Sequence, residues 1–364
     1  MKILVVANMY PSEKDPVYGT FIKVFHDDIK RRNTAGSTNL CTIRGRRFGA
    51  VSKLVTYISY YLRLCGHLLF SRYDLIYVHT ITFPTPALLL ASVFRNLPLV
   101  FNVHGDDVLP SNRFKKLLKK MSAPLLAKAR MVVAPSEYFR NVLQNEFPWL
   151  DKNRIFVSPS GGIKKLFFSV KEPSPLAGRA LRLGYVSRID SGKGWELFVE
   201  LVRILYKKGI DCEATIIGRG SQTHLLEKCI AESGVAHKIQ YLGAKAPEEL
   251  PQYYKEMDLF VFPSSLNESL GLVGIEAMAA CTPVVASNMA GPKGYITDGV
   301  NGYLFKPGDV DSLASCVLKY IALTDEQRSV MAKNAYRLAL DFESEKVAGE
   351  LFERMSVASG RSPD

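Results

Sequence analysis

Short apolar runs alternate along the chain with longer stretches of helical pattern. The runs are rich in valine, isoleucine, leucine and phenylalanine, which is typical of buried strands. They predict strands at residues 2–8, 38–43, 74–79, 98–103 and 130–134 in the first half and at 181–187, 212–217, 238–242, 258–262 and 283–287 in the second half. This alternation favours an α/β fold with a doubly wound parallel sheet in each half.

A segment with charges, prolines and no apolar period separates the two series. It extends from Lys164 to Gly178 and predicts a linker at 166–180. We expect Rossmann-like domains at 1–165 and 181–340, then at 341–364 a helix that returns toward the first domain and a frayed tail. Ligands are expected in a cleft between the two domains, at the carboxyl ends of both sheets.

The composition is typical of a globular protein with two domains of ordinary size. The chain has 364 residues, of which 47% are hydrophobic and 23% are charged. Its six cysteines lie far apart without a C-x-x-C pair, so we expect reduced thiols and no zinc site. The apolar start is too short for a signal peptide, and no apolar run reaches the roughly 18 residues that a bilayer needs. We therefore expect a cytoplasmic protein.

Positive charge is concentrated in the first half of the chain. The net charge is +12, and residues 1–170 hold 25 Lys and Arg against 10 Asp and Glu. The remaining residues hold 22 basic and 25 acidic side chains. This imbalance indicates that the first domain faces something anionic.

Two glutamates, Glu268 and Glu276, stand eight positions apart between a predicted strand and a predicted helix. Gly271 lies between them, and the helix starts at Leu272. A turn of small residues that leads into a helix N-terminus exposes backbone N–H groups and suits an anion. The flanking carboxylates can accept hydrogen bonds from hydroxyls, so the stretch suits a phosphate between two hydroxyl-bearing rings. The alternative, two solvated glutamates, is disfavoured by the flanking predicted strands.

This stretch resembles the E-x7-E signature of the retaining glycosyltransferases of family 4, which have the GT-B fold of two Rossmann-like doubly wound domains facing an interdomain cleft. The resemblance covers nearly the whole chain and is strongest at 181–315. It implies that Glu268 meets the donor sugar, that Glu276 meets the ribose hydroxyls, and that Gly271 and Leu272 lie at the donor phosphates. One departure is Cys281, which stands where the family has glycine.

Two cations, Arg188 and Lys193, lie where a predicted strand turns into a helix. A guanidinium fork and a mobile ammonium suit a diphosphate. Alone they would be read as solvated surface residues. The family has an Arg and a Lys-Gly at this place, and the resemblance implies that they neutralise the leaving nucleotide diphosphate.

Four further residues are implied by the resemblance. Gly218 belongs to a glycine pair close to the nucleotide, although alone it would suit a plain turn, and Leu242 lies in a segment whose backbone meets the base. In the first half, His104 follows a strand and approaches the donor sugar. Gly19 corresponds to the glycine loop under the donor phosphates. A lone histidine is otherwise more often structural.

Residues 309–311 spell D-x-D, the metal motif of the other main glycosyltransferase fold. Here the motif precedes a helical stretch, so Asp309 or Asp311 is predicted to be a helix N-cap. We expect no metal requirement and no cofactor.

Residues 112–121 predict a basic amphipathic helix. Phe114, Leu117, Leu118 and Met121 follow helical spacing, and the remaining positions include four lysines, Lys115, Lys116, Lys119 and Lys120. Such a helix suits an anionic membrane surface. The alternative is an ordinary helix whose apolar stripe packs on the sheet while its lysines are solvated. No nucleic-acid-binding motif accompanies the charge.

Together these features predict a metal-independent retaining glycosyltransferase. It would move a sugar from a nucleotide diphosphate sugar, with UDP favoured, onto a glycan or lipid-linked acceptor in bacterial surface polysaccharide synthesis. It would lie in the cytoplasm, peripheral on the inner face of the membrane. The alternatives are a sugar-nucleotide epimerase of the same architecture and a non-catalytic sugar-nucleotide-binding subunit.

Overall fold

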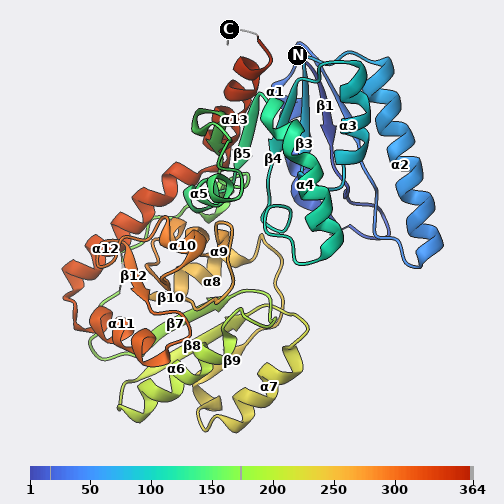
Figure 1. The fold of residues 1–364 in the computed structure, drawn as a ribbon. Coiled ribbons are helices and arrows are strands. Elements are labelled where there is room, and N and C mark those ends of the chain that lie inside the picture. Colours follow the sequence, from blue (N-terminus) through green and yellow to red (C-terminus); the bar gives the residue numbers. More distant parts are fainter. Residues whose placement is uncertain (17, 173, 361–364) are drawn as a thin grey trace. The chain divides into compact units, whose positions relative to one another are not determined.

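The computed structural model describes residues 1–16, 18–172 and 174–360, and it contains two compact units (Figure 1). The first unit comprises residues 1–161 and the chain from Lys346 onward, and the second comprises residues 162–345. The chain thus passes between the units twice, at Gly161–Gly162 and at Glu345–Lys346. In the part that the structure describes, no helix is both long and apolar enough to cross a bilayer.

The first unit is built on a parallel sheet with strand order β2-β1-β3-β4-β5-β6. Its strands are β1 (Lys2–Val6), β2 (Ser37–Cys41), β3 (Leu75–His79), β4 (Leu99–Asn102), β5 (Met131–Ala134) and β6 (Ile155–Val157). Its helices are α1 (Thr20–Arg32), α2 (Ala50–Phe70), α3 (Thr85–Phe94), α4 (Arg113–Lys128), α5 (Glu137–Glu146) and α13 (Ser344–Ala358), with a short 3-10 turn η1 (Lys152–Arg154).

The second unit has a parallel sheet with strand order β12-β11-β10-β7-β8-β9. Its strands are β7 (Leu181–Val186), β8 (Cys212–Ile217), β9 (Ile239–Tyr241), β10 (Leu259–Phe262), β11 (Val284–Ser287) and β12 (Gly302–Phe305). Its helices are α6 (Trp195–Lys207), α7 (Thr223–Glu232), α8 (Leu250–Glu256), α9 (Leu272–Ala279), α10 (Ala290–Lys293), α11 (Val310–Ala322) and α12 (Asp325–Ala339), with 3-10 turns η2 (Lys165–Phe167), η3 (Ala236–Lys238) and η4 (Leu340–Phe342).

Each sheet buries both of its faces, because alternate residues of a strand point to opposite sides. In β1, Leu4 and Val6 pack into the core beneath α2, α3, α4 and α5. Ile3 and Val5 pack on the other face, against α1 and α13. The second sheet is likewise covered on one face by α6, α7 and α11 and on the other by α8, α9 and α12. The near-continuous apolar strands of the sequence follow from this double burial.

The ten predicted strands are all present, and two further strands, β6 and β12, were not predicted. β6 has three residues and β12 has four, and each lies at an edge of its sheet. β12 begins with a glycine, which weakens the strand signal. Both strands are too short to give a clear local signal, and each forms by pairing with a single neighbour, β5 or β11.

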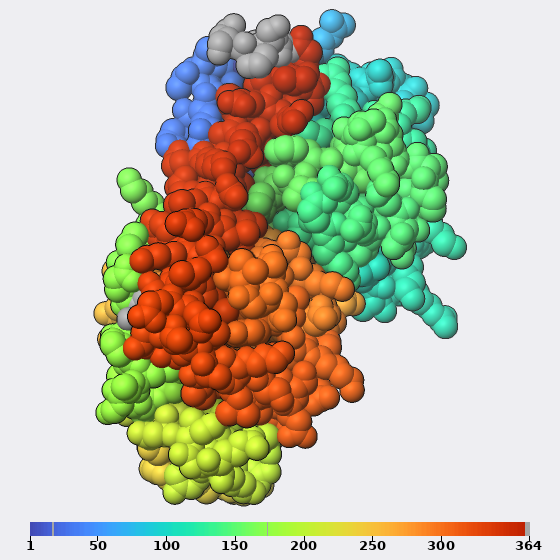
Figure 2. Space-filling model, turned by 90° about the vertical axis from the view of Figure 1, so that its left-hand side faces the viewer, coloured from blue at the N-terminus to red at the C-terminus, as the bar shows by residue number. Residues whose placement is uncertain are grey.

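The segment that joins the two units and the closing helix are placed by packing. Phe167, within the segment 166–180 that was expected to be a linker, is buried in the core of the second unit. Leu351 and Met355 of α13 are buried against Met1 and Ile3 of the first unit. Figure 2 shows α13 in red, beside the blue surface of α1. Of the tail that was expected to fray, residues 361–364 lie outside the described residues.

Cys281 has a left-handed backbone conformation, with φ of +56°. It follows α9, where its N–H donates to the carbonyl of Met278 at 3.0 Å. A side chain in this conformation costs about 1–2 kcal/mol, which glycine avoids. The conformation explains why glycine suits the position that Cys281 occupies in this chain.

Candidate active site

The second unit brings most of the predicted site residues to one edge of its sheet. In the strand order, β7 and β10 are neighbours, and the chain leaves them in opposite directions across the sheet. This is the topological switch point, outside which ligands of such sheets bind. Lys193 lies in the loop after β7, and Glu268 lies in the loop after β10.

The two loops approach each other at backbone distance. The N–H of Ser265 donates to the carbonyl of Gly192 at 2.8 Å. A Cβ at Gly194 would lie 2.0 Å from the carbonyl oxygen of Pro263, and Gly194 has φ of +78°. Glycine is therefore required there both by the backbone conformation and by the close contact. This contact fixes Lys193, between the two glycines, opposite the loop that carries Glu268.

Lys193 and Glu268 form an ion pair across the two loops. The Lys193 Nζ lies 2.6 Å from the Glu268 Oε1, and the two side chains are 13% and 17% exposed. The hydroxyl of Ser264 donates to the same oxygen at 2.8 Å. The hydroxyl of Tyr185 donates to the backbone carbonyl of Lys193 at 3.2 Å. Such a shielded and oriented pair costs desolvation, which its hydrogen bonds offset in part.

Gly271 is the N-cap of α9, with φ of +84°, and Leu272 is the first residue of the helix. Gly271 has no side chain that could cap this N-terminus. The N–H of Gly274 donates to the Gly271 carbonyl at 3.0 Å, and the N–H groups of Leu272 and Val273 lie at the helix end where an anion can bind. The hydroxyl of Tyr295 donates to the Gly271 carbonyl at 3.1 Å and helps to hold the turn. The turn therefore has the form that the sequence predicted for a phosphate site.

Glu276 lies one turn into α9, and its environment differs from that of Glu268. Its Oε2 accepts a hydrogen bond from the hydroxyl of Tyr254, on α8, at 2.9 Å. Burial raises the pKa of Glu276, and the Tyr254 hydrogen bond lowers it in part. Tyr254 is fully buried and was not predicted, because no local pattern marks a tyrosine that reaches a carboxylate 22 positions away.

The first unit holds His104 and Gly19. His104 follows β4, where the carboxylate of Asp107 accepts hydrogen bonds at 3.0 Å from the N–H groups of His104 and Gly105. Gly19 is the N-cap of α1, with φ of +75°. Phe21, in the first turn of that helix, meets the His104 ring edge to face at 4.9 Å. The two predicted residues therefore belong to one local cluster.

The His104 ring has a second histidine as its partner. Its Nε2 lies 3.1 Å from the Nδ1 of His79, at the end of β3. Burial lowers the pKa of both rings, so both are neutral at neutral pH and one donates to the other. His79 was not predicted, because only the pairing of β3 with β4 brings it beside His104.

Two family models together match most of the chain. The model described as Glycosyl transferases group 1 matches residues 169–338, and the model described as Glycosyltransferase Family 4 matches residues 21–161. The chain belongs to the group 1, or family 4, glycosyltransferases.

Curated members of this glycosyltransferase family match part of the chain. The D-inositol 3-phosphate glycosyltransferase of Corynebacterium urealyticum is 29% identical over 211 residues, which are 54% of this chain and 49% of that protein. The amylovoran biosynthesis glycosyltransferase AmsK of Erwinia amylovora is 34% identical over 163 residues, which are 43% of this chain and 40% of that protein. The chain thus matches less than half of the length of these relatives.

A solved structure has the same fold over nearly the whole chain. The crystal structure of HepE from Anabaena in complex with UDP has a TM-score of 0.73 at 21% identity, and 98% of this chain and 100% of that chain are covered. Together with the two parallel sheets, this likeness confirms the predicted GT-B fold of two Rossmann-like domains.

Arg188 lies at the rim of the β7 loop. Its side chain is 74% exposed, and its NH1 lies 2.8 Å from the Oδ2 of Asp190. The other oxygen of Asp190 accepts from the N–H and the hydroxyl of Ser221, both at 2.8 Å. Arg188 is thus held at its carboxylate partner while its guanidinium remains in solvent, unlike the shielded Lys193.

Gly218 and Leu242 connect the carboxyl ends of neighbouring strands. A Cβ at Gly218 would lie 1.8 Å from the carbonyl oxygen of Ser187, so only glycine fits. The Gly218 N–H donates to the carbonyl of Gly243 at 2.8 Å, and the Leu242 N–H donates to that of Ile216 at 2.9 Å. Both predicted residues therefore lie at the same edge of the sheet as Lys193 and Glu268.

The D-x-D segment is part of a helix start. Asp309 is the N-cap of α11, and its side chain accepts from the N–H of Ser312 at 3.0 Å. The prediction that one of the two aspartates caps this helix is confirmed, and Asp309 is that residue. Asp311 lies in the first turn of the helix.

The predicted amphipathic helix is present as the first part of α4, with Asn112 as its N-cap. Its apolar stripe is divided. Leu118 is buried in the unit, whereas Phe114 and Leu117 are 60% and 55% exposed. The helix therefore packs on the sheet with only part of its apolar stripe, and membrane binding by the rest stays a prediction.

The four lysines of α4 are also divided. Lys115 pairs with Asp106, and Lys119 pairs with Glu146 of α5, with side chains that are 22% and 15% exposed. Lys116 and Lys120 are exposed. Half of the expected cationic face is therefore already neutralised by carboxylates within the unit.

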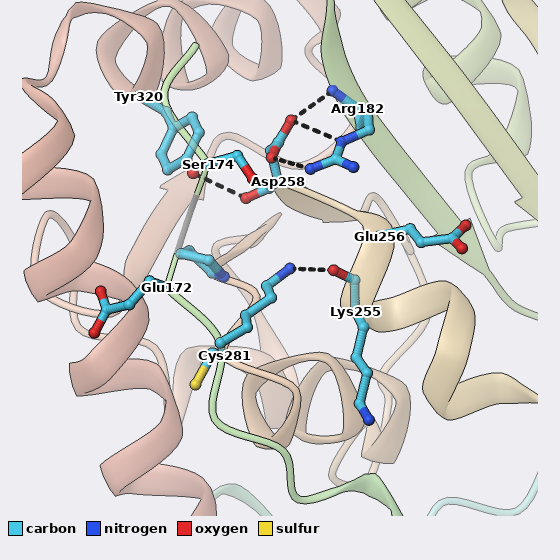
Figure 3. A pocket seen from close by; sticks show the side chains of 10 residues that line it. Glu172, Ser174, Arg182, Lys255, Glu256, Asp258, Cys281 and Tyr320 are labelled. Atoms are coloured by element: carbon cyan, nitrogen blue, oxygen red, sulfur yellow. Dashed lines mark hydrogen bonds and ion pairs between the residues drawn. The ribbon is translucent and has the colours of Figure 1, made fainter.

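A cavity of about 230 Å³ lies at the opposite, amino-terminal edge of the second sheet (Figure 3). Several of its polar side chains already have partners. The Lys171 ammonium donates to the carbonyl of Lys255 at 2.8 Å, at the end of α8, and Asp258 pairs with Arg179 and Arg182. Burial lowers the pKa of Lys171 to about 8. These contacts hold the strand starts together, so we do not assign the cavity to the reaction.

We predict that alanine at Gly194 destabilises the protein more than alanine at Gly209. Both glycines have φ near +75°, at +78° and +72°, but a Cβ at Gly209 meets no atom within 4 Å. Gly209→Ala should cost about 1–2 kcal/mol from the left-handed backbone alone. Gly194→Ala should cost at least about 1 kcal/mol more, from the contact with Pro263. Urea unfolding of both variants measures the difference, and equal costs would contradict the close approach of the two loops.

Tyr254→Phe should raise the pKa of Glu276. The hydroxyl of Tyr254 stabilises the ionised carboxylate, so its removal favours the protonated form. Carboxyl carbon NMR measures this pKa, with Glu276→Gln to identify the signal. Tyr253→Phe, next to it on α8, is the matched control and should leave the titration unchanged. An unchanged or lower pKa in the Tyr254 variant would show that the hydrogen bond does not act on Glu276.

Proposed function

We propose that this protein is a retaining, metal-independent hexosyltransferase. It takes a sugar from a nucleotide diphosphate sugar, with UDP favoured, and transfers it to a glycan or lipid-linked acceptor in bacterial surface polysaccharide synthesis. The observation that carries the proposal is the shielded Lys193–Glu268 pair at the switch point of the second sheet. The uncapped N-terminus of α9 and the carboxylate of Glu276 belong to the same edge.

In this proposal the donor diphosphate is bound by positive groups that the fold holds in place. Lys193 and Arg188 provide full charges, and the N–H groups that follow Gly271 provide partial ones. Negative charge grows on the leaving diphosphate during transfer, so groups fixed before the reaction stabilise the transition state most. Charge stabilisation by these side chains and by the helix is the reason that we propose a metal-independent reaction.

The two glutamates have separate roles in the proposal. Glu276, on a buried turn of α9, accepts hydrogen bonds from the ribose hydroxyls. Glu268 accepts from the donor sugar, while Lys193 and Ser264 orient its carboxylate. A carboxylate held by an ammonium is a weak nucleophile. This supports a front-face route, in which the leaving phosphate helps to deprotonate the acceptor.

The choice of donor and pathway rests on relatives. HepE of Anabaena was crystallised with UDP, and AmsK of Erwinia amylovora is an amylovoran biosynthesis glycosyltransferase. These relatives support UDP as the donor nucleotide and an acceptor in a bacterial biosynthetic pathway. A lipid-linked acceptor would be met at the inner face of the membrane.

Glu268→Ala and Lys193→Ala should each reduce transfer by at least about 10²-fold, since each removes a group that acts on the donor in the transition state. Transfer is measured with labelled donor and an extract of lipid-linked and soluble glycan acceptors, and circular dichroism verifies folding. Lys228→Ala and Glu232→Ala, an exposed Lys–Glu pair on α7, are the matched controls. Wild-type turnover by the Glu268 variant would refute the proposal.

Calorimetry with UDP-, GDP- and ADP-sugars should show the tightest binding for a UDP-sugar. If a GDP- or ADP-sugar binds most tightly, the proposed donor base is wrong, but the proposed sugar-transfer reaction is unaffected. Incubation with the donor alone is the companion experiment. An isomerised nucleotide sugar would identify an epimerase, and binding with no product in the presence of any acceptor would identify a non-catalytic subunit.

A further inference from the structure

Helix α2 has two apolar faces, and only one of them packs on the sheet. Tyr60, Leu64 and Leu68 are buried in the core of the first unit. On the opposite side, five large apolar side chains recur at helical spacing and are between 50% and 75% exposed: Val51, Leu54, Val55, Ile58 and Leu62. A surface helix normally has one apolar side, which packs on the core, and a polar side toward solvent, so this second apolar stripe is not explained by packing within the unit.

The exposed stripe continues onto α3, which packs beside α2. Tyr61 of α2 donates its hydroxyl to the carbonyl of Phe83, just before α3, at 2.9 Å. On the other side of α2, Arg63 donates to the carbonyl of Thr42 at 3.0 Å. From the helical spacing, the stripe faces away from the sheet and lies on the side of α2 that carries Tyr61, next to α3. There Leu90, Val93 and Phe94 are 52–77% exposed. We call the five residues of α2 and these three the α2–α3 apolar surface.

The part of the chain that carries this surface is rich in basic residues and has almost no acidic ones. Residues 29–105 contain ten Lys and Arg but a single acid, Asp74. Arg46 and Arg47 precede α2 and are exposed, although Arg46 lies 3.4 Å from the carboxylate of Asp15. On α4, which packs beside α3, Lys116 and Lys120 are exposed, as are Phe114 and Leu117.

An apolar surface of this extent is unusual for a protein that remains free in water. Its form is that of helices that lie in the plane of a membrane, with an apolar face in the headgroup region and cations beside it. The phenylalanines at the two ends of α2, Phe48 and Phe70, are 83% and 88% exposed and extend the same pattern.

We propose that the α2–α3 apolar surface docks on an anionic membrane. Helix α2 would lie in the plane of the membrane, with its exposed stripe between the headgroups and the surrounding cations at the lipid phosphates. A second copy of this chain fits less well, because a symmetric contact places the same cations opposite one another. The inference rests on the proposed function in one respect only, the need to reach a lipid-linked acceptor.

The test is flotation of the full chain with vesicles of phosphatidylcholine alone or with one third phosphatidylglycerol. Wild type should bind the anionic vesicles, less tightly at high salt. The triple variant Leu54→Ser, Ile58→Ser, Leu62→Ser should bind at least about tenfold more weakly, because it removes apolar area that enters the lipid. Val330→Ser on α12, where the valine is 57% exposed, is the control and should bind as wild type.

A second variant separates the charge from the apolar surface. The variant Arg47→Gln, Lys116→Gln, Lys120→Gln should bind more weakly at low salt and match wild type at high salt, where these charges are screened. Equal binding of the wild type and the triple serine variant would overturn the proposal. So would a wild-type dimer, seen by light scattering, that becomes monomeric in the serine variant without a change in vesicle binding.

The result is independent of the proposed reaction. Binding of UDP-sugar by calorimetry should be equal in wild type and the serine variant, since the altered residues belong to the first unit. If the vesicles bind and no nucleotide sugar does, the docking surface stands and the proposed function fails. If a nucleotide sugar binds and the vesicles do not, the docking proposal fails and the proposed function is unaffected.

Discussion

The arrangement of the candidate active site depends on a close contact between two backbone segments. The loop after β7 and the loop after β10 can meet only because Gly194 has no side chain to strike the carbonyl of Pro263. The contact determines where Lys193 and Glu268 can lie. It therefore brings together an ion pair whose members are 75 positions apart in the sequence. The strand order explains why these two loops are the ones that meet. β7 and β10 are neighbours at the switch point, and their loops leave the same edge.

Much of the fold could be predicted because buried parallel strands have a strong local signal. Runs of branched apolar residues predicted ten strands correctly, whereas β6 and β12 are short edge strands with a weak local signal. The same distinction holds at the site. Glu268 and Glu276 stand in a recognisable strand–turn–helix segment, but Tyr254 and His79 act through contacts that only the tertiary structure creates.

The surface of the first unit was predicted less well than its core. In α4, the periodicity of residues 112–121 was correct for a helix, yet it could not show that Lys115 and Lys119 would meet Asp106 and Glu146. In α2, an apolar stripe at helical spacing is the usual sign of a core face, and nothing local distinguishes it from a second, outward stripe. Burial is decided by neighbouring elements, so periodicity identifies a helix more reliably than it identifies its inner side.

Helix α13 has a consequence for the order in which the chain can fold. Its Leu351 and Met355 complete the core around Met1 and Ile3, which are synthesised long before α13. The first unit is therefore discontinuous, and the second unit is an insertion within it. A ribosome-bound chain can finish the core of the second unit while the part of the first sheet that α13 covers is still exposed. Until α13 is made, α1 alone covers that face, and a chaperone that binds nascent chains could bind the apolar residues left exposed there.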